Sequence, residues 1–157
     1  MSKFDIKIDK AGEKVNVTVT GVIDEDVDFN QHTLTGAQNV EIQLNGVKSI
    51  NSCGIREWIK WVGTAGTAPI VYKECPKIIV DQINMVQGFL PVQGRVESFY
   101  VPYYSDDSGE EKNVLFTFGK EFNDTGLAIP PSVKDGSGNE MEMDVVEQKY
   151  FKFIKKA

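Results

Sequence analysis

VEIQLNGVKSINSCGIREWI, residues 40–59, is the stretch that decides the fold. Its first part alternates apolar and polar residues, with Val40, Ile42 and Leu44 on one side, which is the two-residue period of a half-buried strand. Its second part places Ile55, Trp58 and Ile59 at the 3.6-residue period of a helix, and Val62, just after the stretch, continues the same stripe. The stretch therefore predicts a strand, a short polar turn and an amphipathic helix.

Ser52 stands between the predicted strand and the predicted helix, at the position of a helix N-cap. Its hydroxyl can accept a hydrogen bond from an N–H of the first helical turn. From spacing alone, Ser52 is interpreted as a structural cap.

The residues around Ser52 resemble the signature of the STAS family, the domains that are similar to anti-sigma factor antagonists. In that family a strand is followed by Asp-Ser-Ser/Thr-Gly-Leu and an amphipathic helix, and residues 50–55 here read Ile-Asn-Ser-Cys-Gly-Ile. Gly-Val-Ile-Asp at 21–24 and Gly-Phe-Leu at 88–90 resemble two further motifs of the family. The chain departs from the pattern at Asn51, where the family has aspartate, and at Cys53, where it has serine or threonine.

The resemblance implies a non-enzymatic regulatory module that binds proteins. In the bacterial antagonists of the family, a partner kinase phosphorylates the serine that matches Ser52. The implied partner is a regulatory protein such as an anti-sigma factor or a serine kinase. The expected interface is made of the helix start, the acidic loop before it and the exposed helix face: Asp24, Asp26, Asn51, Ser52, Cys53, Gly54, Arg56 and Lys60. The alternative is a STAS-type sensor that binds a small molecule, a nucleotide or a lipid without phosphorylation.

Segments on both sides of the opening stretch alternate between strand and helix patterns. Strands are predicted at 4–8, 14–20, 69–73 and 95–103, and helices at 52–62 and 74–86. Residues 25–39 are polar, with only Val27, Phe29 and Leu34 as apolar anchors, which predicts a short or irregular helix. This order predicts the α/β class. Together with the resemblance, it implies a STAS-like mixed β-sheet with helices on one face, over residues 1–103.

Residues 104–157 lie outside the resemblance and are expected to form a small β-rich appendage. Two segments, YSDDSGEE at 104–111 and VKDGSGNEM at 133–141, each carry two positions three apart followed by glycine, which resembles the paired knuckles of a zinc ribbon. The four positions are Ser105, Ser108, Lys134 and Ser137. None of them offers a thiolate, so no metal is expected. The segments are therefore either a ribbon that has lost its cysteines or two simple turns.

The chain is expected to end in a short helix over residues 143–154. Asp144 is a candidate cap for this helix. A stripe of four apolar residues should dock on the body of the protein or on a partner: Val146, Tyr150, Phe153 and Ile154.

Composition narrows the range of functions. The net charge of −6 argues against nucleic-acid binding, and no uncharged apolar run approaches the ~20 residues of a membrane span. The two cysteines, Cys53 and Cys75, allow no disulfide framework, so a cytoplasmic location is expected. The single histidine, His32, has no nucleophile motif near it and no phosphate-binding loop is present, so neither enzymatic activity nor a cofactor is expected.

Two further expectations concern surfaces. Trp58 should pack inward from its helix, whereas Trp61 should stay partly exposed. Nothing in the sequence clearly blocks the edges of the sheet, so a homodimer through an exposed strand edge is an open alternative.

Overall fold

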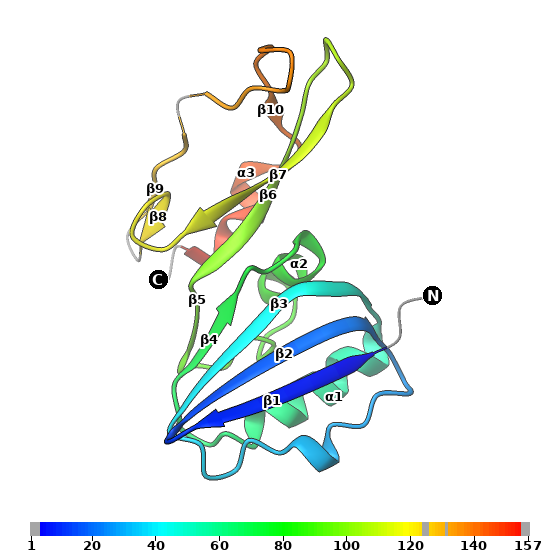
Figure 1. Ribbon diagram of the computed structural model, residues 1–157, viewed down its shortest axis with the longest axis vertical. Coiled ribbons are helices and arrows are strands. Elements are labelled where there is room, and N and C mark those ends of the chain that lie inside the picture. Colours follow the sequence, from blue (N-terminus) through cyan, green and yellow to red (C-terminus); the bar gives the residue numbers. More distant parts are fainter. Residues whose placement is uncertain (1–3, 124–125, 131, 155–157) are drawn as a thin grey trace.

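The first of the two larger β-sheets holds the N-terminal part of the chain. In this computed structural model, which describes residues 4–123, 126–130 and 132–154, the two sheets follow each other along the long axis (Figure 1). The first sheet has the strand order β1-β2-β3-β4-β5. Its strands are β1 (Asp5–Ala11), β2 (Lys14–Ile23), β3 (Asn39–Ile50), β4 (Ile70–Lys73) and β5 (Gly94–Val96). Only β1 and β2 are antiparallel, so the sheet is mixed and the expected α/β class is confirmed.

Two helices cover one face of this sheet. Both α1 (Ser52–Gly63) and α2 (Lys77–Met85) lie behind it in Figure 1. The strand residues that face them are apolar and buried, as with Val15, Val17 and Val19 of β2, whereas the alternate residues of β2 are more exposed. In the described part of the chain, no helix is long and apolar enough to cross a lipid bilayer.

The connection between β2 and β3 contains only one turn of 3-10 helix, η1 (Asn30–His32). This confirms the expectation of a short or irregular helix. The three apolar anchors, Val27, Phe29 and Leu34, are all buried, so this polar segment is held on the protein by a few side chains rather than by regular structure.

The buried centre of the first sheet is a chain of hydrogen bonds between aromatic residues. The indole Nε1 of Trp58 donates to the Tyr72 hydroxyl over 2.9 Å, and that hydroxyl donates to the Phe89 carbonyl over 2.5 Å. The rings of Trp58 and Phe89 are stacked with centroids 5.4 Å apart. Because a buried polar group needs a partner, these bonds fix α1, β4 and the segment after α2 relative to one another.

Trp61 is buried, with 2% of its surface exposed, so the expectation of partial exposure is wrong. Its ring stacks on Phe29 with centroids 4.7 Å apart, and its Nε1 donates to the His32 carbonyl over 2.8 Å. The connection between β2 and β3 therefore covers this side of α1, which helical periodicity alone could not indicate.

The second sheet is antiparallel with the order β10-β6-β7. A two-stranded hairpin and two short helices accompany it. The elements are β6 (Ser98–Tyr104), β7 (Glu111–Thr117), β8 (Phe122–Asn123), β9 (Gly126–Leu127), β10 (Glu142–Met143), α3 (Glu147–Tyr150) and η2 (Lys152–Ile154).

The expected single strand over residues 95–103 is wrong, because the chain changes sheets at Glu97. The Glu97 N–H donates to the Tyr72 carbonyl of the first sheet over 2.9 Å, while its carbonyl accepts from the Phe118 N–H, next to the second sheet, over 2.7 Å. Residues on either side of Glu97 therefore belong to β5 and β6. The last strand of the expected domain over residues 1–103 belongs to the second sheet.

The two sheets share a junction at Glu74, which has a positive φ of 52°. Its N–H donates to the Ser98 hydroxyl over 2.8 Å, and its carboxylate accepts from the Tyr100 hydroxyl over 3.2 Å and from the Gln43 amide. A left-handed conformation is unfavourable for a residue with a side chain. The bonds to β3 and β6 offset that cost and link the two sheets.

The C-terminal helix is shorter than expected. Its N-cap position is Val146 rather than Asp144, and Val146 is 62% exposed, so that member of the expected stripe is not buried. Tyr150 and Ile154 are buried and Phe153 is half-buried. The Asn84 side chain on α2 fixes this segment, because its Nδ2 donates to the Tyr150 carbonyl over 2.8 Å and its Oδ1 accepts from the Phe153 N–H over 2.9 Å.

We predict opposite responses when the hydroxyls of two buried tyrosines are removed. Tyr72→Phe should lower the free energy of unfolding by about 3 kcal/mol, because Trp58 and the Phe89 carbonyl both lose a buried partner. The hydroxyl of Tyr103 is buried and has no hydrogen-bond partner among the described residues. Tyr103→Phe should therefore leave stability unchanged or raise it by up to about 1 kcal/mol. Urea denaturation of both variants measures this, and equal losses would contradict the prediction.

Candidate functional site

The site around Ser52 is built where β2 and β3 end beside the start of α1. Asn51 follows β3 directly, and its N–H donates to the Ile23 carbonyl at the end of β2 over 3.1 Å. Its Oδ1 accepts from the Gly54 N–H over 2.9 Å. Asn51 is therefore the N-cap, with extended backbone, and the interpretation of Ser52 as the cap is wrong. Ser52 is already the first residue of the helix.

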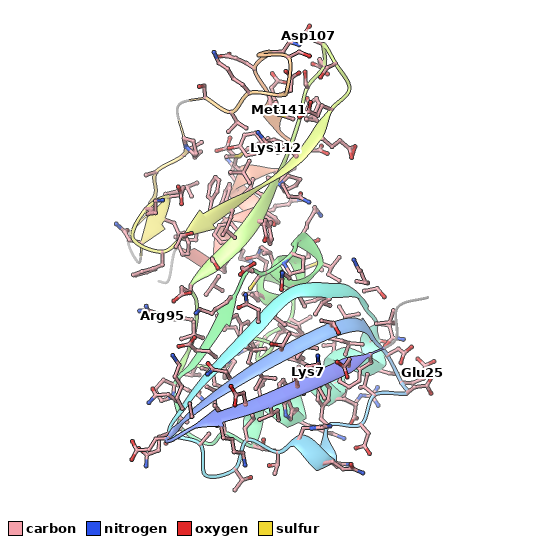
Figure 2. All side chains as sticks on the ribbon, viewed as in Figure 1. Lys7, Glu25, Arg95, Asp107, Lys112 and Met141 are labelled. Carbon is pink, nitrogen blue, oxygen red and sulfur yellow. The ribbon has the colours of Figure 1, made fainter. Side chains whose placement is uncertain are left out.

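Asn51 also fixes the acidic loop. Its Nδ2 donates to Oε1 of Glu25 over 2.9 Å, and this bond, with a backbone hydrogen bond, holds the pKa of the Glu25 carboxyl below its usual value. The Asp24 carboxylate accepts from the Asp26 N–H over 3.0 Å. One amide side chain thus caps α1 and ties the loop to the helix start (Figure 2 labels Glu25).

The three carboxylates of this loop lie close together. Oxygen atoms of Asp24, Glu25 and Asp26 are within 4.8 Å of one another, and no other such group of metal-ligating side chains occurs in the described ranges. Hard cations prefer such oxygens. The carboxylates of Asp24 and Glu25 already accept the hydrogen bonds that order the loop. These bonds are enough to explain why the carboxylates lie close together.

Gly54 is buried where α1 packs against β2. A Cβ atom on this residue would lie 2.1 Å from the carbonyl oxygen of Ile23 and 2.6 Å from the carbonyl carbon of Ile23. Only glycine permits this close approach of two backbones. Gly54 therefore positions the helix start and does not offer a side chain to a partner, whereas its neighbour Cys53 is half-buried.

The remaining candidate residues form one exposed surface. Ser52 and Arg56 are exposed and one helical turn apart, so their side chains lie on the same face of α1. In the described part of the chain, the backbone N–H groups of Ser52 and Cys53 have no hydrogen-bond partner. Lys60 is two turns further along and forms an ion pair with Glu57, with Nζ and Oε2 3.6 Å apart.

The structure separates Ser52 from the single histidine. The His32 carbonyl binds the side chain of Trp61, which is nine residues after Ser52 and about 13 Å further along the helix axis. These two side chains therefore belong to opposite ends of α1 and do not form a nucleophile and base pair.

The two knuckle-like segments come together at the far end of the second sheet, where Figure 2 labels Asp107. Gly109 and Gly138 have positive φ values of 74° and 86°, as the turns require. The group between the turns is the carboxylate of Asp135, which is 7% exposed. The Ser108 hydroxyl donates to its Oδ2 over 2.5 Å, and the N–H groups of Ser137 and Asn139 each donate to its Oδ1 over 2.9 Å.

Two further hydrogen bonds order these turns, one within the first turn and one from Lys112 of β7 to the second turn. The Ser105 hydroxyl accepts from the Ser108 N–H over 3.2 Å, and the Lys134 carbonyl accepts from the Lys112 ammonium over 3.1 Å. Of the four knuckle positions, Ser105 and Ser108 use their hydroxyls, while Lys134 and Ser137 use backbone atoms. The sequence singled out these turns correctly, but it did not identify Asp135 as the group that links them.

Sequence reasoning missed a cleft between α2 and α3. It has a volume of about 580 Å³. Its lining includes Lys77, Asn84, Met85, Val146, Lys149 and Lys152. No local pattern could have identified it, because α3 follows α2 by more than sixty residues and their contact depends on the second sheet.

No protein-family model matches this chain, and no curated protein sequence is significantly similar to it. The resemblance to the STAS family therefore rests on the three short motifs at residues 21–24, 50–55 and 88–90.

The capping geometry predicts different effects of alanine at two neighbouring residues. Asn51→Ala should lower the free energy of unfolding by about 1 kcal/mol or more, because the cap bond to Gly54 is lost. Ser52→Ala should change it by less than about 0.5 kcal/mol, since Ser52 does not cap the helix. Thermal and urea denaturation measure both variants, and a larger loss for Ser52→Ala would contradict the assignment of the cap.

The hydrogen bonds to Asp135 predict that its carboxyl has a pKa below the usual value of about 3.9. The bond from Ser108 is the largest cause. Because the folded-state pKa is the lower one, this stabilisation is present above pH ~4 and is lost as pH falls through the folded-state pKa. Titration of the carboxyl carbon by NMR should show a higher pKa in Ser108→Ala. Ser137→Ala, which keeps the N–H, should leave it unchanged; equal shifts would contradict this.

Proposed function

We propose that this protein is a non-enzymatic regulatory module that binds a protein partner through the start of α1. The partner surface comprises the exposed residues Asp26, Ser52 and Arg56, with Asp24 and Asn51 between them. The proposed partner is a regulatory protein such as an anti-sigma factor or a serine kinase, as the STAS-like motif implies. The observation that carries the proposal is the exposed hydroxyl of Ser52 beside two helix N–H groups that have no partner in the described chain.

Phosphorylation of Ser52 is the proposed switch. A phosphate would add about −1.5 to −2 charges at the first residue of a 12-residue helix. The free N–H groups of Ser52 and Cys53 and the positive end of the helix dipole favour an anion there. Arg56, one turn along, supplies a guanidinium that can pair with phosphate. The fold should therefore tolerate the modification.

The effect on binding follows from the neighbouring charges. The carboxylates of Asp24, Glu25 and Asp26 lie within 4.8 Å of one another, and Glu25 is bound to Asn51, the residue before Ser52. A phosphate would make this patch strongly negative, so a partner that presents carboxylates or apolar surface would be repelled. A partner with a basic patch would instead be held more tightly. The direction of the change therefore reports the charge of the partner.

The test is an affinity capture from the lysate of the native host with three baits. Wild-type protein and Ser132→Glu should retain the same regulatory protein, because Ser132 is exposed and lies in the tail. Ser52→Glu should lose it, or bind it much more tightly if the partner is basic. Bound proteins are identified by mass spectrometry, and circular dichroism checks that each bait is folded.

Two outcomes would contradict the proposal. If all three baits retain the same proteins in the same amounts, Ser52 is not part of the interface. If none retains a protein that dissociates on addition of free wild-type protein, the chain is not a binding module of this kind. The STAS-type ligand sensor would then be the remaining alternative.

A further inference from the structure

The cleft between α2 and α3 is separate from the proposed partner surface on α1. Its volume of about 580 Å³ lies within the range of small-molecule sites, about 300–1,000 Å³. Its walls come from α2, from the segment between β10 and α3, from α3 itself and from the first residue of η2, Lys152. Such a space between helices is a common place for a ligand.

Two apolar side chains at this cleft are left in solvent. Met85 is 72% exposed and Val146 is 62% exposed, although both line the cleft. The described residues contain only three other large apolar side chains that are exposed: Val92, Leu115 and Ile129. Val145 adds a third apolar group to the lining. An apolar body of a ligand would remove this surface from water.

The charges of the lining favour an anion. Lys77 forms an ion pair with Asp81, with Nζ and Oδ2 2.9 Å apart, so these two charges compensate each other. Lys149 and Lys152 have no ion-pair partner in the described part of the chain, and Asp144 is the one other acidic residue of the lining. The cleft therefore has a small excess of positive charge on a chain whose net charge is −6.

We propose that the cleft between α2 and α3 binds a small amphipathic carboxylate. Its alkyl body would contact Met85, Val145 and Val146, and its carboxylate would accept hydrogen bonds from Lys149 and Lys152. A short or medium-chain fatty acid has this chemistry. Its binding would bury apolar surface and pair two ammonium groups at the same time.

The site also places the ligand beside the contact that fixes the C-terminus. Asn84 lines the cleft, and it is the residue that binds the backbone of Tyr150 and Phe153. A bound carboxylate should therefore slow the exchange of these backbone amides by stabilising the packing of α3 on α2.

The test uses decanoate and decyltrimethylammonium, two probes with the same alkyl chain and opposite charge, both below their micelle concentrations. Calorimetry and amide NMR of the full chain should show saturable binding of decanoate, with shifts at Asn84, Val146 and Lys149. The cationic probe should bind at least about tenfold more weakly, because it cannot pair with the lysines.

Variants assign the binding to the cleft. The double variant Lys149→Gln with Lys152→Gln should weaken decanoate binding about tenfold or more, since two charge-assisted bonds are lost. Met85→Gln should also weaken it, and folding should be unaffected because this residue is exposed. Lys48→Gln, an exposed lysine on β3, is the matched control and should bind as wild type does.

Three results would overturn the proposal. Equal affinity for the two probes would show that the lysines do not select an anion. An equal loss of decanoate affinity in Lys48→Gln and in the double variant would show that the probe binds outside the cleft. Shifts at the cleft that depend on protein concentration without any probe would show that a second copy of the chain occupies it. These variants do not change the partner surface on α1. A negative result for the cleft therefore says nothing against the proposed function, which the capture experiment with Ser52→Glu tests separately.

Discussion

The hydrogen-bond chain from Trp58 through Tyr72 to the Phe89 carbonyl is the constraint on which the first sheet depends. These residues come from α1, from β4 and from the segment after α2, and all three are completely buried. A buried polar group without a partner is costly, so the three elements pack together in the one arrangement that satisfies both donors. That arrangement fixes α1 on the sheet and presents its first turn, with Ser52, beyond the end of β2.

Asn51 and Glu74 fix further parts of the chain relative to this centre, one at the start of α1 and the other between the two sheets. Asn51 caps α1 with one end of its amide and holds Glu25 with the other, so the acidic loop and the helix start form one surface. Glu74 connects β3 to β6 and fixes the second sheet relative to the first. The sequence predicted neither role, because the bond from Asn51 to Glu25 and the bonds from Glu74 to Gln43 and Tyr100 all join residues far apart along the chain.

A buried carboxylate lies between the two knuckle-like turns of the second sheet. Asp135 accepts hydrogen bonds from both knuckle-like turns, so it joins two loops that belong to different hairpin segments. Hydrogen bonds to a buried carboxylate are directional and satisfy several donors at once. The structure therefore gives the two turns a common centre made of protein groups, whichever of the two interpretations of their origin holds.

The sequence by itself determined the α/β class, the strand and helix around residues 40–63, and the two turns of the tail. These features depend on the local period of apolar residues and on the positions of the turn glycines. Both can be read from residues that are close together in the sequence. Only the tertiary structure decided that Asn51 caps α1, that the chain changes sheets at Glu97, that Trp61 is buried and that a cleft separates α2 from α3. The cap bond from Gly54 is local, but it depends on the extended backbone of Asn51, whose N–H binds the Ile23 carbonyl at the end of β2. The other three features depend on contacts between residues distant in the sequence, as when the Tyr72 carbonyl and the Phe118 N–H bind the two sides of Glu97. Such contacts are fixed by burial and hydrogen-bond satisfaction in the folded chain, which no local pattern records.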